Sequence, residues 1–340
     1  MRRVQRWLTI ALPLAIVGAA SGAWWIADRL ATPYGAFGDD GIFVEVPEGA
    51  ALAAIGQRLA EAGVVPDATT FRLAAELEGA ARRLQAGEYR FTGGESPREI
   101  VRRIAAGDVY TRLVTFPEGL TIRQLADAFE QAGLGPRAGF VEAAGDASLI
   151  AHLDPGATDL EGYLFPDTYP LPRRVTADEV VGAMVGGFER VFGPDLRAAA
   201  AARGLSVREV VTLAAIIEKE TAAPDEHPLV SAVYHNRLRV GMPLQADPTV
   251  IYAMMQAGIW NGNIRRQDLQ IDSPYNTYRY SGLPPGPIAA PGRASLVAAL
   301  NPADVKYLYF VSRNDGTHVF ATTLVEHNRN VARWQRGAGS

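Results

Sequence analysis

The spacing of apolar residues changes twice along the chain and divides it into three parts. Residues 8–26 form an apolar stretch without a charged residue. From residue 41 to about 150, short alternating runs precede runs with an apolar residue every three or four positions, which are the spacings of strands and helices. From residue 155 onward the helical spacing dominates. The pattern predicts an α+β protein with an N-terminal apolar helix, a βα repeat region and a helix-rich domain.

The apolar stretch predicts a membrane anchor. Its 19 residues are close to the ~20 that a helix needs to span a bilayer, and the three arginines before it predict a cytoplasmic N-terminus. We therefore expect residues 1–29 to form a cytoplasmic tip and a single transmembrane helix, and residues 30–40 to form a linker. The alternative is a cleaved signal peptide, for which Ala19-Ala20-Ser21 offers small residues.

The region 41–150 contains an internal repeat with an offset of 70 residues. V-E-V-P-E-G at 44–49 matches V-T-F-P-E-G at 114–119, and helical spacing follows in both copies. Copies near 44–64 and 114–134 are each expected to form a short strand, a Pro-Glu-Gly turn and a helix. Such a unit buries little surface alone and must pack on a neighbour. The repeat resembles LysM-like modules, which bind N-acetylated sugars of cell walls; a spacer or docking platform is the alternative.

Helix signals are strongest in the predicted domain at 155–336. Ser/Thr-x-x-Glu capping boxes mark three helix starts, at 176–179, 206–209 and 323–326. Predicted strands at 306–312 and 318–322 flank an Asp-Gly pair, which is a strong hairpin signal.

The helix predicted at 207–222 carries the best candidate for an acid. Residues 210–217 are almost wholly apolar, so this helix should be buried, and it ends in Glu218-Lys219-Glu220-Thr221. A carboxyl group against apolar walls has a raised pKa, which suits a general acid near neutral pH. Glu218 and Glu220 point roughly 200° apart at about 100° per residue, so only one can face a given pocket. Helical spacing leaves the choice open, and a solvated helix end is the alternative.

Polar and aromatic residues on rigid loops predict a carbohydrate site. Sugar faces stack on aromatic rings, and sugar hydroxyls bind amides and carboxylates. The candidate substrate-binding residues are Gln245, Asp247, Tyr275, Asn276, Thr277 and Tyr278. Glu161 is a second candidate carboxylate, with hydrogen bonding to its own loop as the alternative. For Asn276 and its neighbours the alternative is a well-packed turn.

Composition excludes several other classes of chemistry. The chain has no cysteine, which excludes thiol nucleophiles, disulfides and Cys-ligated zinc. Its histidines lack zincin spacing, and neither a G-x-S-x-G elbow nor a phosphate loop is present. With 48% apolar and 21% charged residues and a net charge of −4, the chain is globular and has no overall basic field. We therefore expect no metal, no cofactor and no nucleic-acid partner.

Six ordered segments of the second domain resemble the MltG (YceG-like) family of endolytic murein transglycosylases. They are L-E-G-Y-L-F-P-D-T-Y at 160–169, E-K-E-T at 218–221, N-R-L at 236–238, L-Q-A-D-P-T-V-I-Y at 244–252, D-S-P-Y-N-T-Y at 272–278 and G-L-P-P-G-P-I at 282–288. The anchor and the LysM-like region also match the family layout, so the resemblance covers nearly the whole chain.

The resemblance implies an enzyme of the bacterial inner membrane, with its catalytic domain in the periplasm or otherwise outside the cytoplasm. It would cleave nascent peptidoglycan strands between N-acetylmuramic acid and N-acetylglucosamine and leave 1,6-anhydromuramic ends. The family's catalytic glutamate corresponds to Glu218, which would act first as acid and then as base. Glu220, Asn236 and Arg237 are expected to support the structure, with Glu220 pairing with an arginine such as Arg237. Penicillin-binding synthases are the expected protein partners.

Two other functions remain open on the sequence. In a muramidase, water rather than the C6 hydroxyl would end the reaction. In a non-catalytic wall-binding scaffold, the repeat and the anchor would carry the function.

Overall fold

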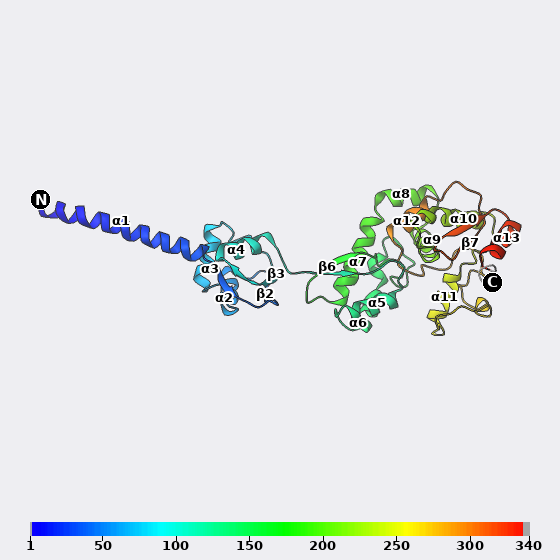
Figure 1. Cartoon of the computed structure of the whole chain (residues 1–340), viewed down its shortest axis with the longest axis horizontal. Coiled ribbons are helices and arrows are strands. Elements are labelled where there is room, and N and C mark those ends of the chain that lie inside the picture. The colour runs from blue at the N-terminus through cyan, green and yellow to red at the C-terminus, as the bar shows by residue number, and fades with distance from the viewer. Residues whose placement is uncertain (1, 336–340) are drawn as a thin grey trace. The chain divides into compact units, whose positions relative to one another are not determined.

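The computed structural model describes residues 2–335, and these form two compact units that divide between residues 112 and 113 (Figure 1). Within the first helix, side chains are described for Leu14 and from residue 16 onward. Each unit has its own hydrophobic core, and the two cores share no residue. The predicted boundary near residues 150–155 thus lies inside the second unit.

The first unit contains four helices and four short strands among its described residues. They are α1 (Arg2–Ala31), β1 (Tyr34–Ala36), β2 (Ile42–Val46), α2 (Leu52–Glu61), α3 (Ala68–Leu77), β3 (Gly87–Phe91), β4 (Gly93–Glu95) and α4 (Pro97–Ala106). Strand β2 pairs antiparallel with β3, and β1 pairs antiparallel with β4. The C-terminal part of α1 belongs to this unit, because Leu30 is buried in its core and Arg29 forms an ion pair with Asp67 (2.6 Å).

The described part of the second unit is dominated by helices. Its elements are β5 (Arg112–Thr115, which begins at the boundary), α5 (Ile122–Gln131), α6 (Arg137–Ala144), β6 (Thr168–Leu171), α7 (Ala177–Val191), α8 (Pro194–Ala202), α9 (Val207–Glu220), α10 (His227–Arg239), α11 (Asp247–Gln256), α12 (Arg293–Leu300), β7 (Tyr309–Ser312), β8 (His318–Ala321) and α13 (Leu324–Trp334). Short 3-10 turns lie at 147–150, 224–226 and 268–270. The prediction of a helix-rich α+β domain is confirmed.

The repeat extends further than the two matching segments. In the first unit β2, α2, α3 and β3 follow one another, and β2 pairs with β3. In the second unit β5, α5, α6 and β6 follow one another, and β5 pairs with β6. Each copy is therefore a strand–helix–helix–strand module. The expected repeat region 41–150 is divided, because one copy packs into each unit.

Helix α9 lies at the centre of the second unit, against α10, α11 and α12 (Figure 1). Residues 210–217 are all buried, as the apolar run predicts. The predicted capping boxes at the starts of α7 and α9 are present, and Thr323 caps α13. The predicted hairpin is also confirmed, since β7 and β8 pair antiparallel across the Asp-Gly turn.

The predicted anchor lies within α1, but the side chains of residues 1–13 and of Ala15 lie outside the described part. Among the described residues, no helix combines the length and the apolar character needed to cross a membrane.

Candidate active site

The C-terminal end of α9 presents Glu218 to a loop and to the start of α12. Glu218 is half-buried. Its Oε2 accepts hydrogen bonds from the backbone N–H of Gly292 (3.0 Å) and from the Ser295 hydroxyl (2.8 Å). Gly292 directly precedes α12, and Ser295 lies in the first turn of this helix. The free N–H groups at the N-terminus of a helix favour a negatively charged partner. The carboxyl group is therefore held in one orientation at the edge of a buried helix.

The second copy of the Pro-Glu-Gly turn closes this site. Gly119 donates its N–H to the Ala290 carbonyl (2.8 Å), and Ala290 donates its N–H to the Leu120 carbonyl (2.8 Å). Lys219 donates from Nζ to the Gly119 carbonyl (3.0 Å). Gly119 adopts a φ of +75°, which favours glycine, and a Cβ there would lie 3.6 Å from Cγ of Glu218. The turn is thus fixed directly against the candidate acid.

This turn brings a second carboxyl group, that of Glu118, beside Glu218. A Cβ on Gly292 would lie 2.0 Å from Oε1 of Glu118, so the glutamate occupies the space that any side chain at 292 would need. Burial and the charge of Glu218 raise the pKa of Glu118, whereas His227 on α10 lowers it. Two carboxyl groups in unequal surroundings are a common arrangement for acid–base chemistry.

Glu220 lies on another face of α9 and has different neighbours. Its carboxylate accepts a hydrogen bond from the Tyr234 hydroxyl (2.5 Å). Burial and the nearby charge of Asp247 raise the pKa of Glu220 to about 7, although Tyr234 and Arg237 oppose the shift. Arg237, the expected ion-pair partner of Glu220, is therefore close enough to affect its pKa, but the hydrogen bond to Glu220 comes from Tyr234. Glu218 and Glu220 point to different faces of α9, as helical spacing requires.

Three of the predicted substrate-binding residues lie around Glu220 rather than around Glu218. Gln245, Asp247 and Tyr278 line a cavity of about 350 Å³ together with Glu220. The Tyr278 hydroxyl donates to the Asp247 carboxylate (2.6 Å), and Gln245 has a φ of +49°. The exposed Gln245 and Asp247 and the half-buried Tyr278 can contact a ligand in this cavity.

Asn276 and Thr277 are buried and hydrogen-bonded within the protein, which differs from their expected contact with substrate. The Asn276 amide donates to the carbonyls of Leu269 (3.0 Å) and Ile271 (2.8 Å). The Thr277 hydroxyl accepts from the Ala246 N–H (3.0 Å). Their polar groups stabilise the loop, because buried polar groups need internal partners.

Asn236 and Arg237 on α10 hold the segment that leads into β7. The Asn236 amide donates to the carbonyls of Val305 and Tyr307, both at 2.9 Å. Arg237 donates from Nε to the Leu308 carbonyl (2.7 Å) and from Nη1 to the Leu244 carbonyl (2.5 Å). Both side chains are buried.

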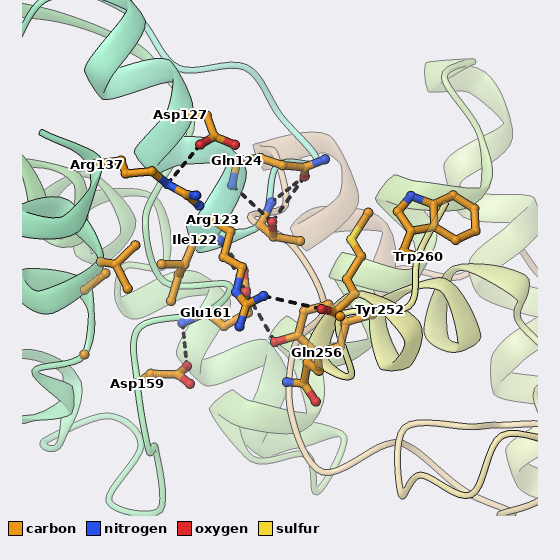
Figure 2. Close-up of a pocket in the computed structure, with 16 residues that line it drawn as sticks. Ile122, Arg123, Gln124, Asp127, Arg137, Asp159, Glu161, Tyr252, Gln256 and Trp260 are labelled. Carbon is orange, nitrogen blue, oxygen red and sulfur yellow. Dashed lines mark hydrogen bonds and ion pairs between the residues drawn. The ribbon is translucent and has the colours of Figure 1, made fainter. Parts of the chain in front are cut away.

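Glu161 lies in the loop that precedes β6, and its buried side chain reaches the N-terminus of α5. It forms part of the wall of a larger cavity of about 540 Å³ (Figure 2). Its carboxyl oxygens accept from the Ile122 N–H (3.1 and 3.3 Å), and Oε2 also accepts from the Tyr252 hydroxyl (3.3 Å). Burial raises the pKa of Glu161 to about 8, with hydrogen bonds opposing the shift. The Tyr275 ring lies 4.9 Å from that of Tyr252, centroid to centroid.

The lining of this cavity combines polar and charged side chains with the flat ring of Trp260, which suits a ligand ring with polar groups and one flat face. Figure 2 shows Trp260 on one side and Arg137 and Asp127 on another, with Gln124 between them. Arg137 forms an ion pair with Asp127 (3.1 Å).

Within residues 2–335, no group of three or more His, Asp or Glu side chains is placed to hold a metal ion.

Glu118 is the site residue that sequence reasoning missed. The repeat made its Pro-Glu-Gly turn look like a purely structural element, because the same turn occurs at 47–49. The turn itself carries no sequence signal that separates the copies, because they differ only in the folded chain: a Cβ on Gly49 would meet open space, whereas one on Gly119 would meet Glu218 and Lys219.

Comparisons with known proteins agree on one family. The model of the YceG-like family matches residues 44–333. The endolytic murein transglycosylase of Bacillus subtilis (strain 168) is 32% identical over 305 residues, which cover 84% of this chain and 82% of that protein. The endolytic murein transglycosylase of Streptococcus pneumoniae serotype 2 is 29% identical over 352 residues, which cover 94% of this chain and 63% of that protein.

A solved structure supports the same conclusion. The crystal structure of the YceG-like protein lmo1499 from Listeria monocytogenes matches with a TM-score of 0.58 and 32% identity. The match covers 85% of this chain and 98% of that one.

Proposed function

This chain belongs to the YceG-like family, and we propose from that premise that it is an endolytic murein transglycosylase. Its substrate is peptidoglycan, and its reaction is a non-hydrolytic cleavage of the glycan strand. The observation that carries the proposal is the Glu218 carboxyl, which is held by Gly292 and Ser295 at the end of a buried helix. The relatives that bear this activity by name match most of the chain.

The finer proposal concerns the bond and the product. The bond broken is that between the C1 of N-acetylmuramic acid and the glycosidic oxygen of N-acetylglucosamine. That oxygen gains a proton, while the C6 hydroxyl of the muramic residue loses one and closes onto C1. Protons and atoms balance without water, so a 1,6-anhydro end results and the strand stops growing. We propose that Glu218 is the catalytic group of this step.

The substrate surface that we propose includes the side chains that line the two cavities. Gln245, Asp247 and Tyr278 would contact one part of the glycan. The cavity beside α5, where Glu161 and Trp260 lie, would hold another. Tyr275 would support this second cavity through Tyr252. We leave Asn276 and Thr277 out of this surface, because their buried side chains are engaged within the loop.

We further propose that residues 1–29 form a single-pass anchor in the inner membrane with a cytoplasmic N-terminus. The uncharged stretch 8–26 and the arginines before it support this placement. The remaining chain would then lie in the periplasm or otherwise outside the cytoplasm. The first copy of the repeat, near 44–64, would belong to a LysM-like module that binds N-acetylated sugars, and the second copy, near 114–134, would belong to the catalytic domain together with 155–336. Penicillin-binding synthases, which make nascent strands, would be partners.

The test is mass spectrometry of products from uncrosslinked glycan strands, with the wild type and the Glu218→Gln variant. We expect fragments with anhydro ends from the wild type and a loss of cleavage of at least ~100-fold in the variant, because acid–base groups typically contribute 10²–10⁴-fold. Glu142→Gln is the matched control, since it makes the same change at an exposed position of α6 outside both cavities and should retain cleavage.

Two outcomes would contradict the proposal in different ways. Reducing ends, about 18 Da heavier by one water, would identify a muramidase on the same framework. Unchanged behaviour of Glu218→Gln in glycan processing would favour a non-catalytic wall-binding scaffold.

A further inference from the structure

The chain contains one turn twice, in two different surroundings. Pro47-Glu48-Gly49 follows β2, and Pro117-Glu118-Gly119 follows β5. Both glycines adopt positive φ, +69° and +75°. A Cβ on the first glycine would meet no atom within 4 Å, whereas the second turn lies against α9. Both turns need a glycine with positive φ, so the turn conformation alone does not explain why Glu118 lies beside Glu218.

Gly292 lies close to both Glu118 and Glu218. Oε2 of Glu218 lies 3.0 Å from the Gly292 nitrogen, and Oε1 of Glu118 lies 2.0 Å from the position of a Cβ on the same residue. Because both oxygens lie close to the same residue, Oε2 of Glu218 and Oε1 of Glu118 lie within about 8 Å of each other. Pairs of carboxyl groups that act on one glycosidic bond lie about 5–9.5 Å apart. The side chain of Glu118 is exposed as a whole while its carboxyl group is partly desolvated, so it can reach a bound strand.

The surroundings of the two carboxyl groups differ. Oε2 of Glu218 faces two donors, an N–H and a hydroxyl, and so is fixed as an acceptor. Burial and the negative charge of Glu218 favour a proton on Glu118, and His227 on α10 opposes them. Lys219 on α9 binds the carbonyl of the turn. Arg293, which begins α12 after Gly292, is exposed.

We propose that Glu118 is a second catalytic residue and performs the acid step, while Glu218 performs the base step. Glu118 donates its proton to the glycosidic oxygen as the bond to C1 breaks. The C6 hydroxyl closes onto C1 and gives its proton to the Glu218 carboxylate. Glu118 ends ionised and Glu218 ends protonated, and exchange with solvent restores both. This division of labour rests on the proposed function and deepens it, because two groups replace the single glutamate implied by the sequence resemblance.

The first test varies the leaving group. The full chain and its Glu118→Gln, Glu142→Gln and Glu218→Gln variants would act on glycan strands and on an aryl β-glycoside of N-acetylmuramic acid. A phenol leaves without a proton, so Glu118→Gln should lose at least ~100-fold on strands and less than ~10-fold on the aryl glycoside. Glu218→Gln should lose both activities. Glu142→Gln, the same change at an exposed position of α6, should behave as the wild type.

The second test does not depend on cleavage. Carbon-13 NMR of the side-chain carboxyl groups, assigned with the two glutamine variants, would follow Glu118 and Glu218 from pH 3 to 9. The inference requires Glu118 to keep its proton to higher pH than Glu218. The reverse order would overturn it, and so would equal losses of Glu118→Gln on both substrates. If the wild type cleaves no glycan but Glu118 and Glu218 titrate in the expected order, the proposed function is contradicted, whereas the assignment of the proton to Glu118 is not.

Discussion

At the scale of single residues, Glu161, Glu218 and Glu220 of the second unit are held in three different ways. Glu218 accepts from a backbone N–H and a hydroxyl, Glu220 from a tyrosine, and Glu161 from a helix N-terminus and a second tyrosine. The same side chain therefore serves different purposes according to the donors around it. Only the geometry reveals which purpose, because helical spacing treats Glu218 and Glu220 alike.

Glu161 should make stability depend on pH. In the folded protein its pKa is raised to about 8, against an ordinary value of 4.5, so the folded state keeps a proton that the unfolded state releases. Its stabilising contribution is full below pH 4.5 and is lost as the pH rises to about 8. Glu161→Gln removes the titration and keeps an acceptor for Ile122. The free energy of unfolding of this variant, minus that of the wild type, should therefore increase by up to about 1.4 kcal/mol for each pH unit between 4.5 and 8.

Urea unfolding at several pH values between 4.5 and 8 would measure this difference. Glu142→Gln, an exposed change on α6, is the control and should follow the wild type. A constant difference between Glu161→Gln and the wild type would show that burial does not keep this carboxyl protonated.

At the scale of elements, the sequence predicted those features that local chemistry determines. The capping boxes at Ser206 and Thr176 and the Asp-Gly hairpin depend on residues a few positions apart, and all are present. The pairing of β5 with β6 was not predicted, because its partners are separated by two helices and a long loop. Glu118 was missed for the same reason: its neighbours Glu218 and Gly292 are remote in sequence.

The cavity beside α5 is also a product of several elements. Residues from α5, α6, α11 and the loop after it line it, and Trp260 offers the flat face. If a sugar ring stacks there, Trp260→Ala should raise KM about 10-fold and leave kcat nearly unchanged, since aromatic stacking contributes about 0.5–1.5 kcal/mol. Steady-state kinetics on soluble glycan strands would measure both constants. Trp334→Ala makes the same change on α13, outside this cavity, and should leave KM unaltered; equal effects of the two variants would remove the cavity from the substrate surface.

At the scale of the whole molecule, two hydrophobic cores without a common residue predict two unfolding events. Phe71 is fully buried in the core of the first unit, and Phe188 is fully buried in that of the second. Replacement of a buried phenylalanine by alanine costs about 3–5 kcal/mol. Scanning calorimetry should therefore show that Phe71→Ala lowers one transition and Phe188→Ala lowers the other. A single transition that both variants shift equally would show that the chain unfolds as one cooperative body.

The strand–helix–helix–strand module that occurs in both units has an evolutionary consequence. Duplication would have produced two equal copies, and the second now lies against α9. Selection then acts on the two copies differently: the glycine of the turn must persist at 49 and at 119, because its backbone conformation demands it in both. If Glu118 acts on the strand, the glutamate should be retained at position 118 and should be free to change at position 48. The substitutions that accumulate in descendant lineages should then record which copy became part of the enzyme.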